Sequence, residues 1–285
     1  MTVNDALNAA ERELAASGVD GPRLTAELIM AHVMETGRAG VYARLRDELA
    51  AVEAERFFEL VERRAGREPL QHITGRQEFF GLDFEVTPDT LVPRPETELV
   101  VTEALKRVAG TTGALVADIG TGSGCIAVAV AVNAPGAIVY AVDVSGPALA
   151  VAGRNAGRHG VADRVRSMQG DLLGPLAGMG LEGRLDVIVS NPPYIPAADI
   201  PGLQPEVQFD PDSALDGGPD GLDVVRRILR DAPAFLKPGG ALLVEVGAGQ
   251  SDAVMQIVSE TGGMSVDTFL VDFAGIERVL VAAKK

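Results

Sequence analysis

The feature that most constrains this chain is an apolar segment that runs directly into a glycine-rich turn and then into a helical pattern. Apolar residues dominate positions 116–119, Gly120-Thr121-Gly122-Ser123-Gly124 follows, and small or apolar residues fill positions 125–132. Glycines in such a turn let the backbone approach a ligand closely. The pattern predicts a strand, a cofactor-binding loop and a helix within a doubly wound α/β sheet.

The spacing of these glycines discriminates between nucleotide-type cofactors. A dinucleotide-binding loop needs its third glycine at the position that Cys125 occupies, so pyrophosphate binding is disfavoured. A second apolar run, 138–142, ends in Asp143, about where an acidic residue accepts hydrogen bonds from ribose hydroxyls. Asp171 and Leu172 follow the next expected strand, 164–169, at the edge where an adenine ring would lie. A plain polar turn is the alternative for these last two residues.

At the end of another expected strand, an asparagine stands between an apolar run and two prolines. The run 185–189 is followed by Ser190-Asn191-Pro192-Pro193-Tyr194, and neither proline can donate to a strand ladder. We expect a buried parallel strand that stops at its carboxyl end, where open α/β sheets bind ligands. The Asn191 side chain, the Pro192 carbonyl and the Tyr194 ring would form a stiff, acceptor-rich cluster that suits an NH2 group. The alternative is a strand-ending turn without chemistry.

The rest of the pattern predicts three parts. Helical periodicity predicts a small helical bundle over residues 1–75, a β-hairpin linker over 76–95 and the cofactor-binding domain over 96–285. In the linker, Pro93 and Pro95 would hold the Arg94 guanidinium in one place, although a plain helix entry explains them equally well. The last domain ends in an antiparallel strand pair and contains a long loop, 195–221, of the kind that is usually functional or mobile.

Composition excludes several classes of protein. With 285 residues, 47% of them hydrophobic, the chain can form one large and one small domain. A net charge of −15 lowers the expectation of a stable nucleic-acid complex. One cysteine and three scattered histidines predict no disulfide and no metal site. Since no segment reads as a signal sequence or a membrane span, we expect a cytoplasmic protein, and we expect a monomer.

The chain resembles the protein-(glutamine-N5) methyltransferases that modify peptide chain release factors. Its compact glycine run resembles the first motif of the class I S-adenosyl-L-methionine-dependent methyltransferases. The wider resemblance is carried by the segments 67–75, 93–98, 118–125, 141–143, 190–195, 214–218 and 274–278. Asn-Pro-Pro-Tyr is shared with DNA adenine-N6 methyltransferases, so the Arg-Pro-Glu-Thr-Glu step at 94–98 and the helical leader are more specific. The family often has an aromatic residue where Leu172 stands, which leaves that contact apolar but without stacking.

The resemblance implies a Rossmann-like class I fold, an S-adenosyl-L-methionine cofactor and methylation of the glutamine amide in the Gly-Gly-Gln motif of release factors, which residues 1–75 would help to dock. The predicted catalytic residues are Asn191, Pro192 and Tyr194. The predicted cofactor-binding residues are Gly120, Thr121, Gly122, Ser123, Gly124, Asp143, Asp171, Leu172 and Asn191. The predicted substrate-binding residues are Asn191, Pro192, Pro193, Tyr194 and Arg94. Acidic residues of the long loop, among them Asp199, Glu206 and Asp210, are expected either to complement a basic release-factor surface or merely to solvate the loop.

Two other classes of function stay open at this point. A DNA or RNA adenine-N6 methyltransferase would need a basic groove and a target-recognition insertion, and the sequence indicates neither. A non-enzymatic binding module that keeps the fold is disfavoured because the glycine loop, Asp143 and Asn191 are all present together.

Overall fold

The computed structural model describes residues 1–285 and contains two compact units. One unit comprises Met1–Arg76 together with Gln204–Phe209, and the other comprises Gln77–Leu203 together with Asp210–Lys285. The chain first passes from one unit to the other after Arg76, one residue beyond the predicted end of the helical part. The sequence pattern did not anticipate that 204–209, inside the long loop, would group with the helices. None of the helices combines the length and apolar character that crossing a bilayer requires.

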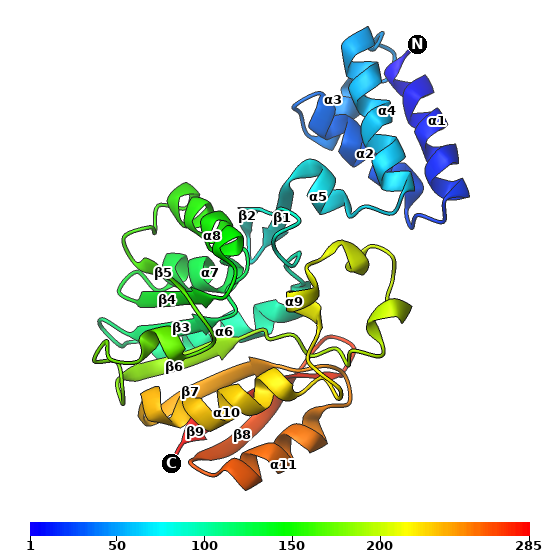
Figure 1. The fold of residues 1–285 in the computed structure, drawn as a ribbon. Coiled ribbons are helices and arrows are strands. Elements are labelled where there is room, and N and C mark those ends of the chain that lie inside the picture. Colours follow the sequence, from blue (N-terminus) through cyan, green and yellow to red (C-terminus); the bar gives the residue numbers. More distant parts are fainter. The chain divides into compact units, whose positions relative to one another are not determined.

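The first unit is a bundle of short helices (Figure 1). Its elements are α1 (Val3–Ala16), α2 (Pro22–Val33), α3 (Arg38–Ala43), α4 (Ala51–Ala65) and α5 (Leu70–Thr74), with the 3-10 turn η4 (Val207–Phe209) from the long loop. Thr2 caps the start of α1, because the Thr2 hydroxyl accepts from the Asp5 amide while the Asp5 carboxylate accepts from the Thr2 amide. The apolar stripes of α1, α2 and α4 meet in a core that contains Leu7, Ile29 and Phe57.

Two arginines of the helical unit hold the loop segment 204–209. Arg67 donates from Nε and Nη2 to the Glu206 carboxylate, both at 2.7 Å, and Arg64 Nη2 donates to the same carboxylate at 2.7 Å. Burial acts to raise the pKa of Glu206, but the hydrogen bonds from Arg67 and Arg64 outweigh it and lower that pKa to about 2. Glu206 is therefore engaged within this unit, as is Arg63 through its ion pair with Glu68.

The second unit opens with a β-hairpin and contains a central sheet. The hairpin strands are β1 (Arg76–Phe79), of which all but the first residue belong to this unit, and β2 (Leu82–Glu85). The order of the central sheet is β5-β4-β3-β6-β7-β9-β8. Its strands are β3 (Leu115–Ile119), β4 (Ile138–Asp143), β5 (Val165–Gln169), β6 (Leu185–Ser190), β7 (Leu236–Glu245), β8 (Met264–Val271) and β9 (Glu277–Lys284). Strands β3 to β7 pair in parallel, whereas β9 pairs antiparallel with both β7 and β8. The predicted α/β class and antiparallel ending are confirmed.

Helices cover both faces of this sheet (Figure 1). One apolar cluster joins the sheet to α6 (Glu98–Val108), α7 (Cys125–Asn133) and α8 (Gly146–Arg158), and it includes Phe79 and Phe84 of the hairpin. A second cluster joins the other face to α10 (Asp223–Phe235) and α11 (Ser251–Thr261). Shorter elements of this unit are η1 (Pro95–Thr97), η2 (Gly174–Leu176), η3 (Ile200–Gly202) and α9 (Asp212–Leu215). The central strands are buried on both sides, as their apolar runs predict.

Strand register brings four functional positions to one edge of the sheet. Ile119 of β3 lies opposite Val142 of β4 and Ser190 of β6, and Ser190 lies opposite Val244 of β7. Because these strands are parallel, the residues at their carboxyl ends meet at the same edge: Gly120, Asp143, Asn191 and Glu245.

Candidate active site

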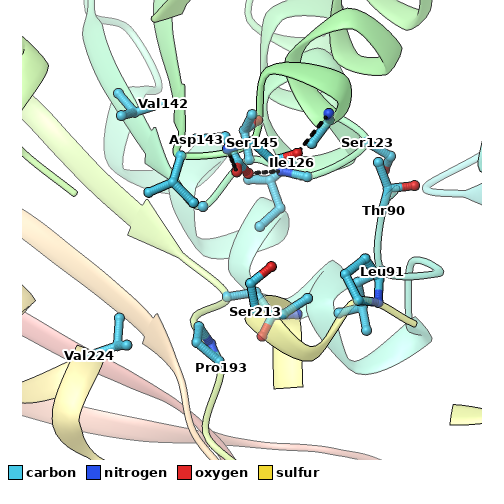
Figure 2. A pocket seen from close by; sticks show the side chains of 18 of the residues that line it. Thr90, Leu91, Ser123, Ile126, Val142, Asp143, Ser145, Pro193, Ser213 and Val224 are labelled. Carbon is cyan, nitrogen blue, oxygen red and sulfur yellow. Dashed lines mark hydrogen bonds between the residues drawn. The ribbon is translucent and has the colours of Figure 1, made fainter. Parts of the chain in front are cut away.

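A cavity opens at this carboxyl edge, entirely within the second unit (Figure 2). Nine of the residues predicted to bind cofactor or substrate line it: Gly120, Thr121, Gly122, Ser123, Asp143, Asp171, Leu172, Asn191 and Pro193. In Figure 2 the side chains of Asp143 and Ser145 lie on one side of the cavity, and those of Ser213 and Pro193 lie on the other. The cavity therefore combines the strand ends that the sequence had pointed to separately.

The glycine loop is shaped by backbone that other residues rarely adopt. Gly120 and Gly122 have φ angles of +73° and +53°. A Cβ at Gly122 would meet no atom within 4 Å, as expected for a residue facing an open cavity. Gly124 is different, because it does not line the cavity and a Cβ there would lie 2.9 Å from Cβ of Ala152. The predicted cofactor contact of Gly124 is therefore replaced by close packing of α7 against α8.

Asp118 fixes the glycine loop through buried hydrogen bonds. It is completely buried, and its Oδ2 accepts from the Thr121 hydroxyl at 2.6 Å and from the Ala127 amide at 3.1 Å. Burial raises the pKa of Asp118 to about 7, although these two hydrogen bonds act in the opposite direction. Asp118 thus fastens the turn to the first turn of α7 and is separated from the cavity itself.

Asp143 ends β4 and holds the upper wall of the cavity. Its Oδ2 accepts from the Gly122 amide and its Oδ1 from the Ser145 amide, both at 2.9 Å (Figure 2). A carboxylate oxygen has two lone pairs, so each oxygen keeps acceptor capacity for a ligand hydroxyl. The residue therefore both orders the glycine loop and offers the acceptors that the sequence predicted for a ribose.

The next wall is formed by Asp171 and Leu172. Leu172 has a φ of +49°, an uncommon conformation for a branched residue, and its side chain lies among the residues that line the cavity. Asp171 forms an ion pair with Arg227 of α10. The cavity thus has an apolar surface at Leu172 and a mixed-charge rim at Asp171 and Arg227.

Asn191 is held by a short chain of hydrogen bonds that sequence reasoning missed. Its Nδ2 donates to Oγ1 of Thr97 at 3.1 Å, and Thr97 Oγ1 donates to Oε2 of Glu245 at 2.7 Å. The Tyr194 hydroxyl reaches Oε1 of Glu245 at 3.4 Å. Thr97 and Glu245 are 1% and 2% exposed, so the chain lies out of water.

Burial dominates the acid–base properties of this cluster. It raises the pKa of Glu245 to about 7, and the nearby charge of Glu96 acts in the same direction. Hydrogen bonds from Thr97 and Tyr194 and the charge of Arg278 oppose that change. Burial, followed by the charge of Glu245, also raises the pKa of Tyr194, which keeps its hydroxyl a proton donor. Glu245 was detectable in sequence as a lone acid that ends an apolar strand, the same signal that identified Asp143.

Besides Gly124, three predicted residues lie outside the lining of the cavity: Pro192, Tyr194 and Arg94. Pro192 is buried, and the Tyr194 carbonyl accepts from Gln250 Nε2 at 2.9 Å. Arg94 Nη2 donates to Oδ2 of Asp210 at 2.8 Å, and Asp210 also accepts from the Val92 amide at 3.2 Å. The Arg94 side chain therefore fastens the end of the long loop to the proline-rich segment.

These contacts correct the expected role of the loop acids. The Asp210 side chain is fully buried against Arg94, and Glu206 is held by Arg64 and Arg67. Neither is an open surface charge for a basic partner. Sequence could not reveal this, because both partners lie more than a hundred positions away.

The segment before α6 supplies further cavity residues that sequence reasoning did not select. Asp89, Thr90, Leu91, Pro93 and Thr97 all line the cavity. The sequence signal that could have identified them was the proline-rich run at 93–95, which we interpreted only as a support for the Arg94 side chain. Buried Cys125 also borders the cavity, and burial raises the pKa of its thiol to about 12, consistent with a packing residue.

The fold of the second unit and the position of its cavity are those of class I methyltransferases. Residues 97–200 match the family model described as the methyltransferase small domain. A methyltransferase structure from Pyrococcus furiosus superposes with a TM-score of 0.54 at 22% identity, covering 78% of this chain and 98% of that one.

The helical unit and the full-length similarity define the family more narrowly. Residues 5–75 match the model described as the PrmC N-terminal domain. The release factor glutamine methyltransferase of Moorella thermoacetica is 46% identical over 285 residues, covering 100% of this chain and 99% of that protein. Its counterpart from Geobacter sulfurreducens is 47% identical over 281 residues, covering 98% and 95%. The chain belongs to the release factor glutamine methyltransferase family.

Proposed function

We propose that this protein transfers a methyl group from S-adenosyl-L-methionine to the side-chain amide nitrogen of the glutamine in the Gly-Gly-Gln motif of peptide chain release factors. The observation that carries the proposal is the position of Asn191, at the end of β6 on the same cavity as the glycine loop and Asp143. Membership in the family, whose relatives carry that activity in their names, supports the substrate.

The residues of the cavity fit this cofactor. Gly120 and Gly122 leave room beside the loop backbone, and Asp143 keeps free acceptor capacity for ribose hydroxyls. Apolar side chains of Ile126, Val142 and Leu172 suit a flat ring. The cofactor would therefore be held by Gly120, Thr121, Gly122, Ser123, Asp143, Asp171 and Leu172, with Asn191 beside it. When bound, it supplies an electrophilic methyl group on a positively charged sulfur.

The protein's task is to orient a poor nucleophile. The lone pair of an amide nitrogen is delocalised into the carbonyl, so the site must favour a geometry in which that lone pair faces the methyl donor. If Oδ1 of Asn191 and the carbonyl of Pro192 each accept one N–H of the glutamine, the remaining direction of the nitrogen is fixed.

The same two acceptors favour the positive charge that grows on nitrogen as its new bond forms, an effect worth several kcal/mol in a preorganised site. Pro193 and Tyr194 would confine the flat amide from the side. The amide proton becomes acidic only as the bond forms and leaves to water afterwards, so no side chain is assigned as a base.

Mass spectrometry of intact release factors incubated with the protein and cofactor tests this function. We expect a gain of one methyl group that maps to the glutamine of Gly-Gly-Gln, and the same incubation with the Asn191→Ala variant serves as control. Methylation elsewhere, or on added DNA or RNA adenine instead, would contradict the proposal.

A further inference from the structure

The hydroxyl of Thr97 lies between two side chains that both compete for it. It is 2.7 Å from Oε2 of Glu245 and 3.1 Å from Nδ2 of Asn191. A hydroxyl carries one proton, so it can donate to only one of these neighbours and must accept from the other. The donor-to-acceptor direction of the hydrogen bonds that link Asn191, Thr97 and Glu245 therefore depends on whether Glu245 is ionised.

When Glu245 is ionised, only one direction of these hydrogen bonds is possible. A carboxylate can only accept, so Thr97 donates to Glu245 and offers its lone pair to Asn191. Only the NH2 end of the Asn191 amide can donate to that lone pair. The carbonyl end, Oδ1, is then turned away from Thr97. That end is the acceptor which the proposed function requires on the substrate amide.

We propose that Thr97 and Glu245 are positioning residues that determine which end of the Asn191 side chain faces the substrate. The inference rests on the proposed function, in which Oδ1 of Asn191 accepts an N–H of the target amide. Strand register supports it, because Ser190 lies opposite Val244 and the next residues, Asn191 and Glu245, occupy the same edge of neighbouring strands. Burying a carboxylate costs stability unless hydrogen bonds compensate, and the Thr97 hydroxyl, at 2.7 Å, is a closer partner of Glu245 than the Tyr194 hydroxyl at 3.4 Å.

Protonation of Glu245 would remove the constraint. A neutral carboxyl can donate to Thr97, which frees the Thr97 hydroxyl to donate to Oδ1 of a flipped Asn191. The flipped amide would present NH2 to a substrate NH2, and neither could accept. The other charged or titratable groups around Glu245 are Glu96 before α6, Tyr194 after β6, Arg278 of β9 and the thiol of Cys125. Since burial places the pKa of Glu245 at about 7, methyl transfer should fall as the solution becomes acidic.

Three single variants test the inference in the full-length protein. Thr97→Val keeps the shape of the buried side chain but removes the hydroxyl, Thr97→Ser keeps the hydroxyl, and Thr261→Val makes the same chemical change in α11. The Thr261 hydroxyl donates only within its own helix, to the carbonyl of Ile257 at 2.7 Å. We expect kcat on a release factor to fall about 10- to 100-fold in Thr97→Val, because the acceptor is no longer held. Thr97→Ser and Thr261→Val should stay within about threefold of wild type.

Two further readouts separate positioning from folding. The pH profile of kcat should lose its acidic limb in Glu245→Gln, which cannot change protonation. Nuclear magnetic resonance of the Asn191 side-chain amide, assigned by its loss in Asn191→Ala, should show slow hydrogen exchange in wild type and Thr97→Ser and faster exchange in Thr97→Val. This second readout needs neither cofactor nor substrate.

The outcomes distinguish this inference from the proposed function. If wild-type protein fails to methylate release factors, the proposed function is wrong, while the exchange measurement still reports on the hydrogen-bond chain. If wild type is active and Thr97→Val matches it in kcat, pH profile and exchange, the positioning role is overturned. Equal loss in Thr97→Ser and Thr97→Val would also overturn it, since the hydroxyl would then not be the property that matters.

Discussion

Replacing Glu245 by glutamine should stabilise the protein relative to wild type, and this gain in stability should be larger at alkaline pH than at acidic pH. Burial moves the pKa of Glu245 from 4.5 to about 7, so the folded protein binds this proton more tightly than the unfolded chain. At ~1.4 kcal/mol per pKa unit, ionising Glu245 in the fold removes roughly 3 kcal/mol of stability. The loss is absent below the unfolded pKa of 4.5, develops as the pH rises and is complete above about 7. Glutamine stays neutral throughout and escapes this loss.

The assay is urea denaturation of both proteins, followed by circular dichroism at about pH 5.5 and about pH 8.5. The quantity to compare is the difference in unfolding free energy between variant and wild type, and its change between the two pH values should be about 2 kcal/mol, because part of the loss is already present at about pH 5.5. Asp118, whose pKa burial also raises to about 7, is present in both proteins and cancels in the comparison.

A difference that does not depend on pH would refute the reasoning, because it would mean that Glu245 titrates alike in the folded and unfolded states. A change of opposite sign would mean that the Arg278 charge and the hydrogen bonds from Thr97 and Tyr194 outweigh burial. Combined with reduced methyl transfer, the expected result would identify Glu245 as a group kept at a cost in stability for the sake of its site.

Three further predictions concern single contacts. Asn191→Ala should abolish methyl transfer while calorimetric titration still detects nearly normal cofactor affinity; substantial residual turnover would exclude the acceptor role. Asp143→Ala should weaken cofactor binding by about 1 to 3 kcal/mol, since it loses ligand acceptors and frees the glycine loop, with a smaller effect on turnover at saturation; an unchanged dissociation constant would remove it from the site. Arg67→Gln should speed hydrogen exchange of residues 204–209 about fivefold, the value of a partly exposed ion pair of ~1 kcal/mol with Glu206; unaltered exchange there would show that other contacts hold the segment.

The family and the strand ends that form the cavity were predictable because their signals are local. The glycine run, Asp143 and Asn191 each stand directly after an apolar run, and parallel strands bring such positions to one edge whatever the loops between them do. Nine of the predicted site residues line the cavity for this reason. The release-factor resemblance added the substrate, which no local pattern of strands and helices could supply.

Side-chain partnerships were not predictable in the same way. Arg94 was expected at the substrate, yet it binds the buried carboxylate of Asp210. Gly124 was expected at the cofactor, yet it allows α7 to pack on Ala152. In both cases the sequence identifies a constrained residue, but the origin of the constraint lies in a segment far along the chain.

The sequence alone determined the layered α/β architecture, the helical leader and the strand ends that carry Gly120, Asp143 and Asn191, because hydrophobic periodicity and turn residues act over a few positions. The tertiary structure alone decided that Thr97 meets Asn191 and Glu245, and that Glu206 meets Arg64 and Arg67. Such contacts require donor and acceptor atoms to lie about 3 Å apart, within a few tenths of an ångström, although their chain segments are separated by up to 148 positions. Only the packed fold fixes distances of that kind.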